Sequence, residues 1–182
     1  MIGPKAPTGA QASMTQPSGL EISPAKSSDV PLILSLINEL ADYEKLRHES
    51  VATEASIDKA LFGPKPGAEA VIARFDGEPA GFALFFPDFS TWRGRPGLFL
   101  EDLYVREWAR GRGVGRRLIA RLAAIAIERD WPALRLDVLD WNPAREFYQR
   151  LGIEARNAWV PYGATGAALR RLAAAEDPGD AE

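Results

Sequence analysis

Residues 110–115 combine residue types and a spacing that suit the binding of a ligand. Three of these six residues are glycines, at positions 111, 113 and 115. Glycine lets the backbone turn sharply and leaves its N–H groups unshielded by side chains. An apolar run, 98–105, precedes the segment, and a helical pattern begins near Gly113. The first turn of that helix adds unpaired N–H donors and the positive end of the helix dipole. The segment therefore predicts an anion-binding loop, and phosphate is the anion that fits it best.

Two adjacent carboxylates, Glu101 and Asp102, lie inside the apolar run before the loop. Burying a charge is costly, so such a pair in an apolar strand indicates function. Side chains alternate along a strand, so only one of the two can face a ligand cleft unless a β-bulge intervenes. The alternative interpretation is a structural ion pair with one of the neighbouring arginines.

The composition excludes several kinds of chemistry. The 182-residue chain has no cysteine, which rules out disulfides, thiolate metal sites and a cysteine nucleophile. Its single histidine, His48, lies in a charged segment, so we expect no metal site. The net charge of -3 argues against general nucleic-acid binding. No apolar run is long enough to span a membrane. We therefore expect a cytoplasmic protein with a small-molecule partner and neither a nucleic-acid nor a membrane partner.

Hydrophobic periodicity and turn residues predict a definite order of elements. Strands are expected at 20–23, 70–73, 80–86, 98–105, 134–139 and 154–162, with an Asp76-Gly77 turn after the second and a loop over 87–97. Helices are expected at 32–40, 53–62 and 113–129, then one opened by Asn142-Pro143 and ended by Gly152, and a short one capped by Thr165.

Hairpins early in the chain and strand–helix–strand units later predict an α/β (α+β) fold, a mixed sheet with helices on both faces. The length fits one domain, which we place at 20–175. Residues 1–19 are rich in Gly, Pro, Ala and Ser, and we expect an added or disordered extension there. Residues 176–182 are expected to form a flexible acidic tail.

The glycine loop differs from two well-known phosphate loops. No Lys-Ser or Lys-Thr follows the glycines, so the Walker A pattern is absent. The dinucleotide fingerprint Gly-x-Gly-x-x-Gly follows a first strand, whereas this loop comes late and has a different spacing. The segment instead resembles the acetyl-CoA loop of the GNAT acetyltransferases, Arg/Gln-x-x-Gly-x-Gly/Ala, with matches at Arg110, Gly113 and Gly115.

Three flanking motifs strengthen this resemblance. Leu-Glu-Asp-Leu-Tyr-Val at 100–105 precedes the loop, Asp-Trp-Asn-Pro at 140–143 follows it, and Phe-Tyr-x-x-Leu-Gly occupies 147–152. In this order they resemble the diamine branch of the family, the spermidine/spermine and thialysine acetyltransferases, over residues 20–175. The resemblance implies the GNAT fold, with a mostly antiparallel sheet of six to seven strands, and a homodimer.

The resemblance also implies acetyl-CoA as co-substrate, with no metal. The loop amides would bind the pyrophosphate, while the Arg110 side chain can be structural. Amides around Leu103 and Val105, on a strand that the family splays open by a bulge, would bind the pantetheine arm and the acetyl oxygen. The cofactor-binding residues implied in this way are Leu103, Tyr104, Val105, Arg110, Gly111, Arg112, Gly113, Val114, Gly115, Asn142 and Tyr148.

Acetyl transfer to an amine needs a base, an acid and donors for the oxyanion. The attacking amine must be neutral, although a free alkylamine has a pKa of about 10. The departing thiolate needs a proton. The resemblance assigns Tyr148 as the acid and Glu101 as the base, acting through water. From periodicity alone, a core tyrosine with its hydroxyl hydrogen-bonded is the favoured interpretation of Tyr148, and the Phe-Tyr-x-x-Leu-Gly match reverses that preference.

Acidic and aromatic residues suggest the acceptor. The segment 39–44 matches the Glu-Leu-Ala-x-Tyr-Glu signature of the resembled branch. Carboxylates with aromatic rings suit a polyvalent alkylammonium through charge and cation–π contacts. A solvated helix face is the alternative. The substrate-binding candidates are Glu39, Tyr43, Glu44, Asp88, Trp92, Glu101 and Asp102.

The sequence thus predicts an N-acetyltransferase that moves an acetyl group from acetyl-CoA to a primary amine of a small diamine, polyamine or lysine-like amino acid, by direct attack in a ternary complex. The alternatives are an acetyltransferase for protein amines or aminoglycosides, and a non-catalytic acyl-CoA-binding regulatory module. Pro161 and Gly163 depart from the family pattern, which usually has strand-forming residues there, and this puts the usual dimer details in doubt.

Overall fold

The computed structural model describes residues 19–175 and divides the chain after Asn142 into two units. The first unit holds the sheet and its helices, and the second runs from Pro143 onward. The extension expected at 1–19 lies outside the described residues except for Gly19, and the tail expected at 176–182 lies wholly outside them. A single domain over 20–175 stays a prediction.

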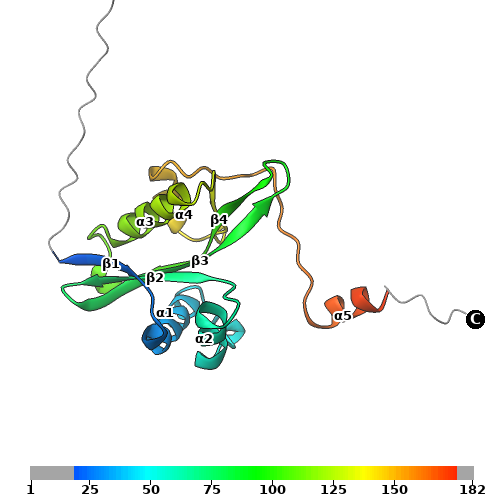
Figure 1. The fold of residues 1–182 in the computed structure, drawn as a ribbon, viewed down its shortest axis with the longest axis horizontal. Helices are drawn as coiled ribbons and strands as arrows, with labels where there is room; N and C mark the ends of the chain where they lie inside the picture. The colour runs from blue at the N-terminus through cyan, green and yellow to red at the C-terminus, as the bar shows by residue number, and fades with distance from the viewer. Residues whose placement is uncertain (1–18, 176–182) are drawn as a thin grey trace, which may run out of the picture. The chain divides into compact units, whose positions relative to one another are not determined.

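The first unit is built on a five-stranded sheet (Figure 1). Its strands are β1 (Leu20–Pro24), β2 (Glu69–Phe75), β3 (Glu78–Ser90), β4 (Arg95–Val105) and β5 (Leu134–Leu136). They lie in sequence order, all antiparallel except for the parallel pair β4–β5. The mixed, mostly antiparallel sheet is confirmed, whereas the expected count of six to seven strands is too high.

The hairpin β2–β3 turns as its sequence predicts. Asp76 and Gly77 both adopt positive φ, 50° and 85°. A tight type I′ turn needs this conformation at its two central residues, and Asp-Gly is one of the pairs that favour it.

The predicted loop over 87–97 is wrong, because most of it continues the β3–β4 hairpin. The two strands stay paired as far as Ser90 opposite Arg95, and only 91–94 form the turn. Pro87 and Pro96 are tolerated because this end of the hairpin is a two-stranded ribbon: β2 pairs with β3 only up to Phe85, and β5 begins opposite Leu98. Proline needs a position where no ladder N–H is required, and ribbon edges supply it.

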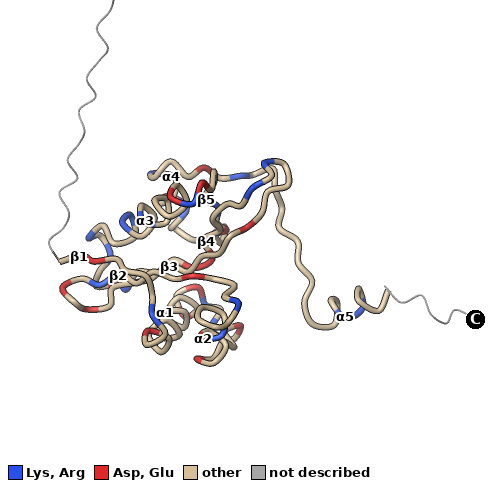
Figure 2. The backbone as a smooth tube through the Cα atoms, viewed as in Figure 1, with Lys and Arg blue, Asp and Glu red and all other residues tan. Residues whose placement is uncertain are grey.

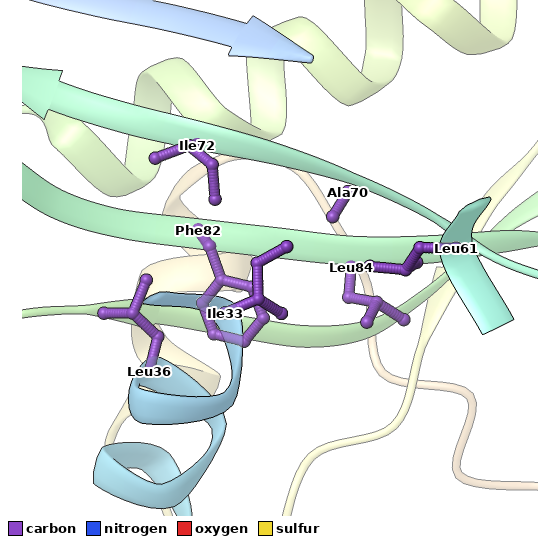
Figure 3. Packing of buried hydrophobic residues seen from close by; sticks show 7 residues of the cluster. All are labelled: Ile33, Leu36, Leu61, Ala70, Ile72, Phe82 and Leu84. Carbon is purple, nitrogen blue, oxygen red and sulfur yellow. The ribbon is translucent and has the colours of Figure 1, made fainter. Parts of the chain in front are cut away.

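Helices cover both faces of this sheet, as expected. Helices α1 (Val30–Tyr43) and α2 (Glu54–Phe62) pack on one face and α3 (Val114–Glu128) on the other (Figure 1). Under α1 and α2 lies a core cluster whose residues come from both helices and from the strands β2 and β3: Ile33, Leu36, Leu61, Ala70, Ile72, Phe82 and Leu84 (Figure 3). Each large apolar side chain buried there contributes about 1.5–3 kcal/mol. This cluster fixes α1 against the sheet.

A β-bulge interrupts the β3–β4 ladder at Glu101. Leu84 lies opposite Asp102, and the next residue, Phe85, lies opposite Leu100, so Glu101 has no counterpart on β3. The extra residue reverses the alternation of β4. Leu100 is therefore buried on the α3 face, whereas Asp102 and Tyr104 turn to the face covered by α1. The bulge decides which side chains face the site.

The second unit contains two short helices, α4 (Ala144–Arg150) and α5 (Gly166–Ala174). Gly152, at φ 79°, follows the end of α4 as predicted, and Thr165 is the N-cap residue of α5. The strand expected over 154–162 is wrong, because the segment forms no strand. Pro161 lacks a backbone N–H, which removes one ladder hydrogen bond from any strand there. Within 19–175, no helix has the length and apolar content needed to cross a membrane.

Candidate active site

The glycine loop joins the end of β4 to α3 through a short 3-10 turn, η3 (Glu107–Ala109). Gly111 and Gly113 have φ of 74° and 81°, a region that favours glycine. A Cβ built at either position meets no atom within 4 Å, so the space beside the loop backbone is open. Gly113 caps α3, and its carbonyl accepts the N–H of Arg117 at 3.0 Å. The loop therefore has the shape of a cradle beside the N-terminus of a long helix, which suits an anion.

The pairing of strands β4 and β5 ends before β4 reaches this loop. Their pairing ends at Leu100 opposite Leu136. Beyond it, β4 continues to Val105, paired only with β3 in the described part of the chain. Backbone groups of Leu103, Tyr104 and Val105 that point away from β3 thus face no neighbouring strand. An extended amide-bearing ligand could take the place of the missing strand there.

The arginines of the loop direct their side chains away from the glycine backbone. Arg110 donates a hydrogen bond from Nε to the carbonyl of Val105 at 3.0 Å, and its guanidinium lies over the Tyr43 ring at 4.8 Å. Arg112 lies over the rings of Phe75 and Trp108, at 5.5 and 5.9 Å. Both side chains contact aromatic rings, so the loop backbone is the part left to hold an anion.

Three carboxylates meet where the bulge turns β4 toward α1. Burial, together with the smaller effects of the Glu101 and Glu44 charges, raises the pKa of Asp102 from its ordinary value of 3.8 to about 6. Burial also raises the pKa of Glu44, which follows the last residue of α1. Glu101 is exposed. The structure therefore brings together Glu44, Glu101 and Asp102 as an anionic cluster suited to a cation.

Asn142 is the one buried polar residue of the described chain and supports this cluster. It is 6% exposed, and its Nδ2 donates to the carboxylate of Glu44 at 3.4 Å. Helix α4 begins at Ala144 with Pro143 as its N-cap, so the expected cap at Asn142 is wrong by one residue. The Asn142 side chain also reaches Glu44, the residue that follows α1.

Other predicted substrate residues are placed differently. Glu39 binds Arg106 through both oxygens, at 2.7 and 3.0 Å, and these hydrogen bonds hold its pKa below the ordinary range. Asp88 pairs with Arg135 of β5. Asp88 lies four residues along β3 from Leu84, or about 13 Å from the bulge. Trp92, in the hairpin turn, is 87% exposed. The candidate residues at the end of α1 and at the bulge therefore lie close together. Asp88 and Trp92, at the end of the β3–β4 hairpin, lie apart from them.

Tyr148 belongs to the second unit. It lies on α4, is 9% exposed, and packs its ring against Phe147 at 5.1 Å between centroids. Its assignment as the acid stays a prediction.

Sequence reasoning did not identify two arginines that engage the candidate residues. Arg106 forms an ion pair with Glu39, and Arg135 forms one with Asp88. An arginine in the middle of a three-residue apolar strand, as Arg135 is, was the available signal for a paired charge. Within the described chain, no group of three or more histidine or acidic side chains is arranged to hold a metal ion.

Comparisons with known proteins agree with this geometry. The acetyltransferase (GNAT) family model matches residues 34–153. A thialysine N-epsilon-acetyltransferase of Bos taurus is 37% identical over 164 residues, covering 84% of this chain and 96% of the relative. An L-ornithine N5-acetyltransferase of Arabidopsis thaliana is 26% identical, covering 81% and 85%. Among solved structures, an integron cassette protein from the mobile metagenome of V. cholerae is 25% identical, with a TM-score of 0.72 and coverage of 86% and 99%.

Proposed function

The chain belongs to the GNAT acetyltransferase family and is an acetyltransferase, and we propose that it moves an acetyl group from acetyl-CoA to a primary amine of a small diamine, polyamine or lysine-like amino acid. The observation that carries the proposal is that β4 contains both the bulge that turns Asp102 and the unpaired end that leads to the glycine loop. The bulge places Asp102 toward Glu44, and the same strand then parts from β5 and leads into the glycine cradle. In this proposal, acetyl-CoA and the acceptor amine therefore bind beside neighbouring residues of one strand.

The residues present fit acetyl-CoA. The open space beside Gly111 and Gly113 accommodates a pyrophosphate against backbone amides, which a Cβ at either position would narrow. The edge of β4 at Leu103 and the N–H of Val105 face no neighbouring strand and can hydrogen-bond the amides of the pantetheine arm, whereas the Val105 carbonyl already accepts from Arg110. Acetyl-CoA supplies the thioester, and the chain supplies orientation and proton transfer.

Three carboxylates share the roles of binding and deprotonating the acceptor amine. Asp102 and Glu44 hold the incoming ammonium, which relieves the repulsion within their cluster. Glu101, exposed on the bulge, takes the ammonium proton through water. The neutral nitrogen then attacks the thioester carbonyl carbon, which forms the new C–N bond and a tetrahedral oxyanion, and the C–S bond breaks when that oxyanion collapses. Removal of a proton by Glu101 precedes attack, because a protonated amine has no free electron pair.

A backbone amide of β4 is the proposed donor to the oxyanion, and Tyr148 is the proposed acid. The oxyanion of the tetrahedral intermediate needs donors fixed in advance, which a strand edge provides. Tyr148 gives its proton to the departing sulfur, the nitrogen loses its second proton to water, and Tyr148 regains a proton from solvent, so the products are free CoA and the acetamide. The match of Phe-Tyr-x-x-Leu-Gly to the family motif supports this role.

The names of the relatives support an amino acid with a side-chain amine as acceptor. The bovine relative is named for thialysine and the Arabidopsis relative for L-ornithine, and both are covered over most of their length. Each of these acceptors carries a primary amine at the end of a short alkyl chain. An anionic cluster formed by Glu44, Glu101 and Asp102 suits such a terminal ammonium.

The direct test measures free thiol during incubation with acetyl-CoA and an amine panel. The panel contains thialysine, lysine, ornithine, spermidine and putrescine, with an aminoglycoside and a peptide N-terminus for comparison. We expect thiol release with at least one small alkylamine and acetamide formation in equal amount. Thiol release with only the peptide or the aminoglycoside would show that the acceptor is not a small alkylamine. Binding of CoA without turnover on any amine would refute catalysis.

A further inference from the structure

Arg110 belongs to the glycine loop, yet its side chain reaches toward the acceptor side. Its Nε donates to the Val105 carbonyl at 3.0 Å. Its guanidinium carbon lies 4.8 Å from the centre of the Tyr43 ring and 5.8 Å from that of Tyr104. A guanidinium over an aromatic face is attracted by the negative charge of the ring. One side chain therefore joins the loop, the end of α1 and the end of β4.

Both tyrosines adjoin the carboxylates of the acceptor cluster. Tyr43 is the last residue of α1 and directly precedes Glu44. Tyr104 lies two residues after Asp102 and so shares its face of β4. A change in the orientation of Arg110 therefore acts on the two elements that present these carboxylates.

The contacts of Arg110 differ from those of the arginines that hold the fold together. Arg74, Arg106, Arg129 and Arg135 each pair with a carboxylate. Within residues 19–175, the structure shows Arg110 in no ion pair. A carbonyl and two ring faces hold it instead. Such contacts depend on orientation and can tighten when the loop closes on an anion.

We propose that Arg110 is a positioning residue that couples the cofactor loop to the acceptor cluster, so that CoA on the loop raises the affinity for the amine. The inference rests on the proposed function. Coupling is reciprocal, so the amine must raise the affinity for CoA by the same factor. We expect a factor of roughly five to fifty, within the range usual for coupled sites.

The test titrates thialysine into the full-length protein by calorimetry, with and without saturating CoA. It compares the wild type with Arg110→Gln and Arg112→Gln. The second variant is the matched control, because it removes the same charge from the same loop while its side chain contacts Phe75 and Trp108 instead. We expect coupling of at least about fivefold in the wild type, close to one in Arg110→Gln, and at the wild-type value in Arg112→Gln.

A second pair of variants separates coupling from a general loss of structure. Tyr43→Phe keeps the ring beneath the guanidinium and should keep the coupling, whereas Tyr43→Leu should lose it, with the affinity for each ligand alone measured in the same titrations. Equal coupling in Arg110→Gln and wild type overturns the inference, as does equal loss in Arg110→Gln and Arg112→Gln. A wild type that binds thialysine no better with CoA overturns it too. Failure of the proposed function gives a different result: calorimetry shows the coupling, but no amine causes thiol release.

Discussion

At the scale of single residues, Asp102 links the bulge to the stability of the protein. Its pKa of about 6, against 3.8 ordinarily, means that the folded state holds this proton more tightly than the unfolded chain. Between these values the folded state binds more protons, so the free energy of unfolding falls as the pH rises through the window. A shift of this size corresponds to a loss on the order of 2 to 3 kcal/mol by pH 7.

The Asp102→Asn variant should therefore be more stable than the wild type at pH 7, by on the order of 1 to 3 kcal/mol, because no buried charge forms. The difference should nearly vanish at pH 4, where Asp102 is neutral in the folded state. Urea denaturation at the two pH values measures both free energies. A variant that is less stable at pH 7 and at pH 4 alike would show that a lost hydrogen bond outweighs the charge.

The same pKa bears on activity. If an ionised Asp102 holds the ammonium, kcat/KM for the amine falls as the pH drops below about 6. Removing the neighbouring charge with Glu44→Gln lowers the pKa of Asp102, so the acidic limb should move to lower pH, even as the amine KM rises. Initial rates from pH 5 to 8 measure the limb. A limb that stays in place would remove Glu44 from the electrostatics of Asp102.

Tyr148 has the most direct test at this scale. Tyr148→Phe removes only the hydroxyl, so the affinity for acetyl-CoA should change little. Turnover should fall by about a hundredfold if the hydroxyl protonates the departing thiolate. Stopped-time thiol assays give kcat, and calorimetry gives the CoA affinity. An unchanged kcat would leave Tyr148 as a core tyrosine.

At the scale of elements, the sequence predicts the order of secondary structure well and its pairing less well. The apolar stripe of α3 through Leu118 and Leu122 and the Asp76-Gly77 turn follow from local periodicity and turn chemistry. The bulge at Glu101 depends on how β3 and β4 pair, which no local pattern in β4 reveals. The missing strand over 154–162 likewise depends on whether a partner strand is present.

The same distinction between local patterns and long-range pairing applies to the candidate site. Motif spacing located the glycine loop and the acidic pair, because both are local in sequence. It did not show that Arg106 would occupy Glu39, or that Asn142 would reach Glu44, because these contacts span 67 and 98 residues. Adding the bulge to the sequence pattern explains why Asp102 turns toward α1 and is more buried than the exposed Glu101.

The glycine loop permits a matched test of its backbone. Gly113→Ala places a Cβ at φ 81°, which costs about 1 to 2 kcal/mol, and narrows the anion cradle. Gly94→Ala is the control, because Gly94 has φ 65°, equally open surroundings and a place in the β3–β4 turn, at the opposite end of β4 from the loop. We expect similar losses of thermal stability, but a rise of tenfold or more in acetyl-CoA KM only for Gly113→Ala. A similar KM rise in both variants would remove the loop from cofactor binding.

At the scale of the whole molecule, α5 lacks the packing that normally stabilises a helix. It buries no residue, although Leu169 and Leu172 give it an apolar side. Trp159, Val160 and Tyr162 before it are also exposed. A nine-residue helix that buries none of its residues is marginal by itself, and several exposed apolar side chains within a short stretch of sequence favour an interaction site there. A second copy of the chain is the partner we expect, in line with the predicted homodimer.

Light scattering after size exclusion should then give a mass of about 40 kDa, twice the 19.9 kDa of one chain. The double variant Leu169→Glu with Leu172→Glu should shift the mass toward the monomer, because two charges replace the apolar side of α5. Ile127→Glu is the control, since Ile127 is 79% exposed on α3 and should leave the dimer intact. A wild type of monomer mass refutes the homodimer, and dissociation by Ile127→Glu would move the interface from α5 to α3.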